Sequence, residues 1–124
     1  MSSLEQIVLP LAESRALVEA GIVLETAMRW VKNHYNQAPF AIPVWFPPAD
    51  GEVVLCPAPA LSELLDAIRA KQPYAVVQCG DRPRGYVGSE KRACSAMQPE
   101  GCSDIRYGDT DLLAAYALLM EVAK

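Results

Sequence analysis

Hydrophobic positions in the first third of the chain recur at helical spacing. Residues 11–20 are good helix formers, and Gly21 stands where a glycine would end a helix. Just beyond it, four apolar residues occupy positions i, i+3, i+4 and i+7, namely Leu24, Ala27, Met28 and Val31. This spacing predicts a second helix over residues 23–34, so that two short helices meet at a corner.

The next segment changes from helical spacing to prolines and strand formers. Prolines surround residues 41–46 (AIPVWF), which excludes a helix and favours an edge strand. Asp50 and Gly51 form a turn dipeptide, and residues 52–56 (EVVLC) are rich in β-branched and apolar side chains. We therefore expect a β-hairpin over residues 41–56.

Leucines at helical spacing return in residues 60–71, where we expect a third helix. Glu63 stands at the third helical position, from which a carboxylate reaches back to an unpaired N–H at the helix start. Ala60 occupies the place where such a capping box usually has Ser or Thr.

Strand patterns dominate the part of the chain that follows. Residues 74–79 (YAVVQC) carry the strongest strand pattern, and a weaker return strand is expected at residues 85–88. Residues 89–108 show no clear period, so we expect a loop there, with one short strand near residues 105–107.

A segment rich in leucine and alanine, residues 111–122, predicts a final helix capped by Asp109 or Thr110. The expected order of elements is α-α-β-β-α-β-β-α. This order predicts one α+β domain over residues 1–124, with a small, largely antiparallel sheet of about four strands. With 124 residues, of which 52% are hydrophobic, the chain is long enough to bury a core.

Charge and composition narrow the classes of function. The net charge is −4, whereas proteins that bind nucleic-acid phosphates usually carry an excess of Lys and Arg, so the balance argues against a nucleic-acid partner. No apolar run approaches the roughly 18 residues of a membrane helix. The N-terminus has Glu5 in place of the basic region of a secretory signal. We expect a cytoplasmic protein whose four cysteines stay reduced.

The predicted helical corner raises the alternative of a DNA-binding regulator. Gly21 would be the turn glycine of a helix-turn-helix formed by residues 11–34. The face that would read a groove carries apolar residues and Glu25, whose carboxylate would repel phosphate. A packed corner is therefore the preferred interpretation, and DNA binding is kept as the alternative.

Catalytic and cofactor signatures are missing from the sequence. His34 is the only histidine and stands in no evident nucleophile context, so a Ser-His-Asp arrangement is not indicated. No phosphate-binding glycine motif and no nucleophile-elbow motif occurs. The sequence therefore predicts a protein without catalytic residues or cofactors, and not an enzyme.

Four cysteines leave open a third possibility, a thiol protein or a metal-binding protein. They lack the short paired spacing of a structural zinc site. Cys56 and Cys79 end apolar strands, where we expect them to be buried. Cys94 and Cys102 fall in the predicted loop, where we expect exposure, with a disulfide or a labile metal site as an alternative.

Two clusters are candidate partner-binding sites. Trp45 and Phe46, together with Pro47 and Pro48, form a rigid aromatic–proline segment, and aromatic residues carry much of the energy at protein interfaces. Residues 81–92 form a loop with a positive excess, from which we expect four residues to contact the partner: Arg82, Arg84, Tyr86 and Arg92. The alternatives are that the aromatics cover the protein's own core and that the loop is a solvated hairpin.

Three stretches share motifs with a known family. The stretch LAESRALVEAGIVLETAMRWV carries a Ser-x-x-Leu-x-x-x-Gly-Ile…Glu-Thr-x-x-x-Trp pattern at Ser14, Leu17, Gly21, Ile22, Glu25, Thr26 and Trp30. The stretch CPAPALSELLDAI contributes Pro57, Ala58, Glu63, Leu64 and Leu65. With the closing stretch DTDLLAAYALLMEV, these motifs resemble small uncharacterised proteins of phages and prophage-bearing bacteria. The resemblance does not extend across residues 75–108.

The resemblance implies an α+β fold and a phage- or prophage-associated setting, and it transfers no catalytic residue. Since catalytic signatures are missing and an aromatic segment remains, we expect a small accessory protein. It would act by binding another macromolecule, in the first instance a host protein.

Overall fold

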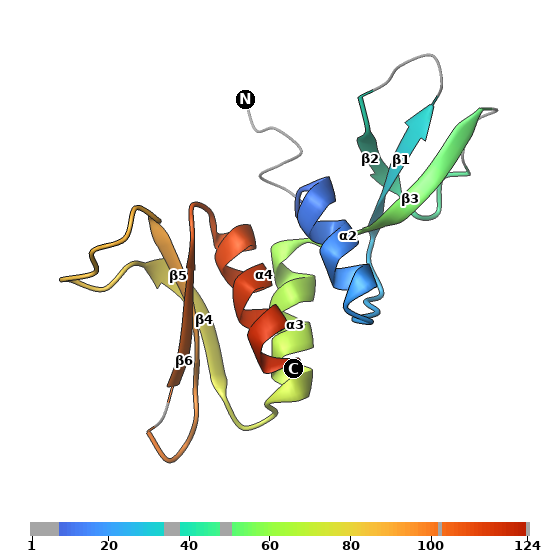
Figure 1. Cartoon of the computed structure of the whole chain (residues 1–124). Coiled ribbons are helices and arrows are strands. Elements are labelled where there is room, and N and C mark those ends of the chain that lie inside the picture. Colours follow the sequence, from blue (N-terminus) through green and yellow to red (C-terminus); the bar gives the residue numbers. More distant parts are fainter. Residues whose placement is uncertain (1–7, 34–37, 48–50, 102, 124) are drawn as a thin grey trace. The chain divides into compact units, whose positions relative to one another are not determined.

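The computed structural model describes residues 8–33, 38–47, 51–101 and 103–123 (Figure 1). The chain forms two compact units, Met1–Glu63 and Leu64–Lys124, which are described separately below. Within the described residues there are three α-helices and six strands, so the α+β class is confirmed. The strands form two antiparallel three-stranded sheets, where the sequence predicted a single sheet of about four strands.

The first unit contains one helix and one sheet. Its elements are α2 (Leu11–Glu19), β1 (Met28–Asn33), β2 (Phe40–Pro43) and β3 (Glu52–Ala58). Strand β1 lies in the middle of the sheet, between β2 and β3 (Figure 1). The core of this unit gathers Val8, Trp30, Cys56 and Ala58. Trp30 lies directly between Ala41 of β2 and Cys56 of β3 in the register of the strands.

The helix α2 ends as the sequence predicts. Gly21 has a φ of 81°, which favours glycine, and its N–H donates to the carbonyl of Val18 over 3.0 Å. The N–H of Ile22 donates to the carbonyl of Leu17, also over 3.0 Å. These two bonds form a Schellman motif, which satisfies the last carbonyls of the helix.

A single buried carbonyl joins the start of this helix to the sheet. The carbonyl oxygen of Leu9 accepts hydrogen bonds from the Ser14 hydroxyl and from the Trp30 indole N–H, each over 3.0 Å. The N–H of Leu9 donates to the carbonyl of Pro59 over 2.8 Å. Leu9 and Ser14 are almost completely buried, so these bonds satisfy polar groups that would otherwise be costly in the core.

The predicted second helix over residues 23–34 is wrong. Residues 28–33 form strand β1, which pairs with β2 on one side and β3 on the other. Trp30 and Val31 favour strands, and the hydrogen bonds from two neighbouring strands outweigh the helical spacing of the apolar residues. A helix-turn-helix needs a helix in this position, so the DNA-binding alternative loses its structural basis.

The predicted hairpin over residues 41–56 has the right strands and the wrong pairing. Strands β2 and β3 do not pair with each other, because β1 lies between them. The register shifts between Trp30 and Val31, which face Cys56 and Val54 respectively. Leu55 is therefore the extra residue of a β-bulge, and it turns toward the core of the unit.

The second unit contains a three-stranded sheet and a helix that packs on it (Figure 1). Its elements are the larger part of α3 (Leu61–Lys71), then β4 (Val76–Asp81), β5 (Arg92–Met97), β6 (Ser103–Gly108) and α4 (Asp111–Val122). The sheet order is β4-β5-β6, and α4 contacts all three strands. The helix α4 supplies much of the core through Leu112, Ala114, Ala115, Leu118 and Leu119.

The prediction from the sequence did not identify most of the strands of this sheet. The predicted loop over residues 89–108 contains β5 and β6, and the predicted return strand at residues 85–88 is not a strand. Strand β5 reads RACSAM, whose small residues have low strand propensity. It forms because it bonds to a strand on each side and buries Ala93, Cys94 and Ala96.

Local signals at the helix starts are confirmed. Thr110 is the N-cap of α4, and its hydroxyl accepts a hydrogen bond from the N–H of Leu113 over 3.2 Å. Glu63 accepts a hydrogen bond from the N–H of Ala60 over 2.8 Å, as the back half of a capping box does. Its other carboxylate oxygen accepts from the N–H of Ala27, also over 2.8 Å. None of the helices in the described ranges is long and apolar enough to cross a membrane.

Replacing Glu63 by Ala removes both of these acceptors. The N–H groups of Ala27 and Ala60 lose their charged partner, so we expect the free energy of unfolding to fall by about 1–3 kcal/mol. Denaturant-induced unfolding followed by circular dichroism measures the change. The control is Ser62→Ala on the exposed side of the same turn, for which a change below about 0.5 kcal/mol is expected. Equal stabilities of the two variants would contradict the role of Glu63.

The backbone of Gly108 lies close against the start of α4. A Cβ atom at this position would lie 2.5 Å from the backbone nitrogen of Ala114, so Gly108→Ala must displace the helix. We expect a loss of about 1–3 kcal/mol in the free energy of unfolding, as for other overpacked sites. Gly80→Ala is the matched control in β4, because a Cβ there meets open space within 4 Å. A stable Gly108→Ala variant would mean that α4 does not lie against β6 in this way.

Candidate functional site

Trp45 and Phe46 lie in a surface turn that follows strand β2. We call residues 44–47 the aromatic turn. In this turn Trp45 is 78% exposed and Phe46 is 50% exposed. The two rings meet edge to face, with centroids 5.9 Å apart and planes at 67°. The aromatics therefore do not serve as the core of the unit, which is built around Trp30.

Backbone hydrogen bonds and one arginine hold the aromatic turn in place. The N–H of Val44 donates to the carbonyl of Ala27 over 3.0 Å, and the N–H of Phe46 donates to that of Pro43 over 3.1 Å. The Nη2 atom of Arg29 donates to the carbonyl of Phe46 over 2.7 Å. The turn is thus fixed by bonds at both ends, although its aromatic side chains face solvent.

A mainly apolar hollow of about 350 Å³ adjoins the aromatic turn. Its wall consists of Leu24, Glu25, Thr26, Arg29, Val44, Val54 and Pro57. Among the described residues, the buried Nε atom of Arg29 has no hydrogen-bond partner, although Nη2 of the same side chain is bonded. Val54 of strand β3 is 45% exposed, so the apolar wall of the hollow extends onto this strand.

The second predicted cluster lies in the loop between β4 and β5, in the other unit. Tyr86 stacks on Tyr107 of β6 with ring centroids 4.0 Å apart, and its hydroxyl donates to Glu90 over 2.6 Å. The Nη1 atom of Arg82 donates to the carbonyl of Gly88 over 2.9 Å. Both residues therefore shape the loop itself, and Arg84 is an exposed residue of the same loop.

Arg92 is committed to interactions within the second unit. Its guanidinium bonds to Asp81 over 2.6 Å and to Asp111 over 2.7 Å, which joins β4, β5 and the first turn of α4. Trp45 and Phe46 lie side by side, whereas the other four predicted residues belong to the other unit and serve different roles, three of them in the β4–β5 loop and Arg92 on β5. Of these four, Arg92 is the one whose charge is most fully used inside the fold.

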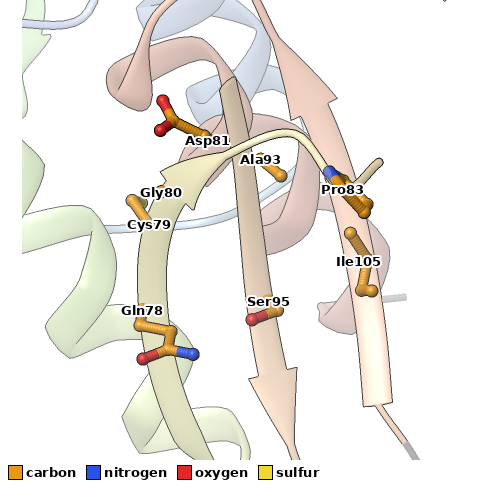
Figure 2. Close-up of a pocket in the computed structure, with 8 residues that line it drawn as sticks. All are labelled: Gln78, Cys79, Gly80, Asp81, Pro83, Ala93, Ser95 and Ile105. Atoms are coloured by element: carbon orange, nitrogen blue, oxygen red, sulfur yellow. The ribbon is translucent and has the colours of Figure 1, made fainter. Parts of the chain in front are cut away.

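A small hollow of about 190 Å³ lies over the sheet of the second unit (Figure 2). Gln78, Ser95 and Ile105 stand in one row across β4, β5 and β6, and Pro83 comes from the loop that follows β4. Gly80 and Ala93 face each other in the neighbouring row and add little bulk. An amide and a hydroxyl can bind a small polar group there, but histidine is not among the lining residues.

The cysteines are arranged differently from the prediction. Cys56 is buried as expected, and this burial raises the pKa of its thiol. Cys79 is half-buried and Cys94 is completely buried, although Cys94 was predicted to be exposed. The two residues face each other directly across β4 and β5. Cys102 lies outside the described residues, and within them no three His, Cys, Asp or Glu side chains gather into a metal-binding group.

The pair of Cys79 and Cys94 is the feature that sequence reasoning missed. The two residues are separated by a long loop, and Cys94 belongs to a strand that the sequence did not predict. A signal was nevertheless present, because a cysteine at the end of a strong strand and a second beyond a glycine-rich turn are compatible with an antiparallel pair. Only the register places the two thiols opposite each other.

Comparison of the chain with models of known families, with curated proteins and with solved structures finds no match. The surface and chemistry of these residues are therefore what indicate a function.

Tyr86 provides a titration that checks the loop structure. The hydrogen bond to Glu90 raises the pKa of Tyr86 to about 12 and lowers the pKa of Glu90. The contribution of this bond is fully present below the usual tyrosine pKa of about 10, and it is lost as the pH rises through about 12. On the acid side it is lost as the pH falls through the lowered pKa of Glu90.

We expect the ultraviolet absorbance of phenolate to show one tyrosine that ionises near pH 12. Tyr86→Phe should remove this transition, which assigns it. Glu90→Gln should move it toward the usual value of about 10, because the carboxylate acceptor is lost. An unchanged transition in Glu90→Gln would show that the hydrogen bond is absent in solution.

Proposed function

We propose that this chain is a small accessory protein that acts by binding another protein through the aromatic turn and the adjoining apolar hollow. The single observation that carries the proposal is the turn itself, which is fixed by hydrogen bonds and still exposes 78% of Trp45. The resemblance to small phage and prophage proteins adds the proposal that the partner is a bacterial host protein.

A segment that is already ordered in the free protein loses less conformational entropy on binding. A side chain that is mobile in the free protein loses conformational entropy when a partner immobilises it. Here the Arg29 bond to the carbonyl of Phe46 and the backbone bonds of the turn already restrict this segment. Tryptophan in such a position is the residue type that most often dominates binding energy at protein interfaces.

The hollow supplies the complementary part of the surface. A partner that covers Trp45 also reaches the apolar walls around Val44 and Val54, and an apolar side chain of the partner fits the space of about 350 Å³. Arg29 adds a polar contact at the wall, because its Nε atom can donate to a partner carbonyl once the guanidinium adjusts. An apolar centre with a few polar contacts is the usual anatomy of a specific protein interface.

In this proposal the positive loop of the second unit contributes less to binding than the aromatic turn does. Arg92 and Tyr86 are engaged within the fold, whereas Arg84 is exposed. We therefore assign the main binding energy to Trp45 and Phe46 and keep Arg84 as a contributor to charge attraction at long range.

Trp45→Ala tests the proposal in the full-length chain. The immobilised wild-type protein captures its partner from an extract of the bacterial host, and the purified partner is then titrated against each variant. We expect Trp45→Ala to raise Kd at least tenfold, with the unfolding temperature nearly unchanged because the side chain is exposed. In the wild-type protein, covering Trp45 should shift tryptophan emission to shorter wavelength.

Tyr74→Ala is the matched control, because Tyr74 is an aromatic residue of similar exposure at 81% in the other unit. Its Kd should stay within about twofold of the wild-type value. Equal losses in the two variants would point to non-specific adhesion of exposed aromatics. A large drop in the stability of Trp45→Ala would instead place Trp45 in the core and remove the proposal.

A further inference from the structure

Cys79 and Cys94 form a pair of opposed thiols at the edge of the second sheet. Cys79 lies on β4, an outer strand of the order β4-β5-β6, and Cys94 lies directly opposite on the central strand β5. Directly opposed residues of an antiparallel pair have Cα atoms about 4.5–5.5 Å apart, which falls within the range that a disulfide spans. The two side chains thus meet the basic geometric requirement without any rearrangement of the strands.

The surroundings of the pair distinguish its two members. Cys94 is completely buried, whereas Cys79 is half-buried on the outer strand, so reagents in solution reach Cys79 first. A side-chain hydrogen-bond interaction with Cys94, aided by the charge of Arg92, lowers the pKa of Cys79 against the opposing effects of burial and of Asp111. The same bond and burial raise the pKa of Cys94. One cysteine is therefore suited to attack and the other to remain a protonated thiol.

We propose that Cys79 and Cys94 are a redox-active pair that forms a reversible disulfide by exchange with a low-molecular-weight disulfide such as oxidised glutathione. The inference rests on the register of β4 and β5 and on the unequal exposure of the two thiols. It does not depend on the aromatic turn, which belongs to the other unit.

The exchange takes place in two balanced steps. The Cys79 thiolate attacks one sulfur of the disulfide RSSR, a bond forms between Cys79 and one RS group, and the other leaves as RS⁻. The Cys94 sulfur then attacks Sγ of Cys79 and gives up its proton to solvent or to the departing thiolate. The Cys79–Cys94 bond forms and the second RS⁻ leaves. The protein loses two electrons and two protons, and RSSR is reduced to two RSH molecules.

Formation of the mixed disulfide on Cys79 makes it easier for the Cys94 thiol to lose its proton. In the mixed disulfide, Cys79 carries no negative charge, so the hydrogen bond and charge that held the proton on Cys94 are removed. Arg69 of α3 lies close enough to favour the Cys94 thiolate at this stage. Attack by Cys94 is intramolecular and its target is the directly opposed sulfur, so resolution should be faster than capture of a second glutathione.

Oxidation would clamp the two ends of the loop that contains Arg82, Arg84 and Tyr86. The Cys79–Cys94 bond closes the β4–β5 hairpin immediately beside the ion pair of Asp81 and Arg92. A disulfide between directly opposed residues of neighbouring strands has restricted geometry. Strained disulfides have higher reduction potentials, as labile and regulatory disulfides do. Thiols should therefore reduce it again.

The test incubates the full-length native protein with oxidised glutathione and maps its disulfides by mass spectrometry under non-reducing conditions. Cleavage after glutamate places Cys79, Cys94 and Cys102 in separate fragments, because Glu90 and Glu100 lie between them. We expect a fragment pair joined through Cys79 and Cys94, with the loss of two hydrogen atoms, which dithiothreitol reverses. Before oxidation, iodoacetamide should label Cys79 at least about tenfold faster than Cys56.

Single variants separate the two steps. Cys94→Ser should accumulate a glutathione adduct on Cys79, because the resolving thiol is gone, whereas Cys79→Ser should form neither the adduct nor the bond. Cys56→Ala and Cys102→Ser are the controls and should oxidise as the wild-type protein does. Circular dichroism confirms that each variant is folded, and Cys94→Ala replaces Cys94→Ser where the buried hydroxyl prevents folding.

Three results would overturn the proposal. These are a wild-type protein whose Cys79 remains a free thiol after oxidation, a disulfide that joins Cys94 to Cys102 instead, and a folded Cys94 variant without an adduct on Cys79.

Discussion

In the described residues, one helix, α2, accompanies the three-stranded sheet of the first unit, and α4 with the larger part of α3 accompanies that of the second. This limited cover determines which parts of each sheet reach the surface. In the first unit, Trp30, Cys56 and Ala58 form one packed side of the sheet with Val8 and Leu11. Valines of β3 and the aromatics that follow β2 remain exposed. In the second unit, α4 contacts the sheet, and Tyr86 of the β4–β5 loop stacks on Tyr107.

Polar groups shared between elements restrict how each unit can be arranged. In the first unit the Leu9 carbonyl accepts from both Ser14 and Trp30, so the start of α2 and the central strand share one acceptor. In the second unit Arg92 joins Asp81 and Asp111, so the outer strand β4 and the first turn of α4 share one guanidinium. The buried Leu9 carbonyl favours one arrangement, because another would leave polar atoms without partners in the core. The ion pairs of the partly exposed Arg92 restrict the second unit less strongly, because solvent screens them.

The two proposed activities depend on different features of these partly covered sheets. The aromatic turn is ordered by its backbone, and its side chains have no cover within their unit, which suits a surface that another protein completes. The opposed cysteines arise because strand β5 is built from small residues that let α4 approach, and sulfur is one of the few reactive atoms that such a strand can carry. Partner binding depends on exposed apolar surface, and disulfide formation depends on the register of β4 and β5.

Local features of this protein could be predicted from its amino-acid sequence. The helices α3 and α4, the Glu63 and Thr110 caps and the glycine that ends α2 could all be predicted, because their hydrogen bonds join residues a few positions apart. The exposed Trp45 and Phe46 were recognised as a candidate site, but not the arginine that holds their turn.

Contacts between distant segments, in contrast, select which residues form strands and which side chains face each other. Residues 28–33 carry helical spacing, and residues 92–97 carry almost no strand signal, yet both became central strands. A strand gains its hydrogen bonds from segments remote in sequence, so its stability cannot be read from its own residues. The Cys79–Cys94 pair follows from the same long-range register.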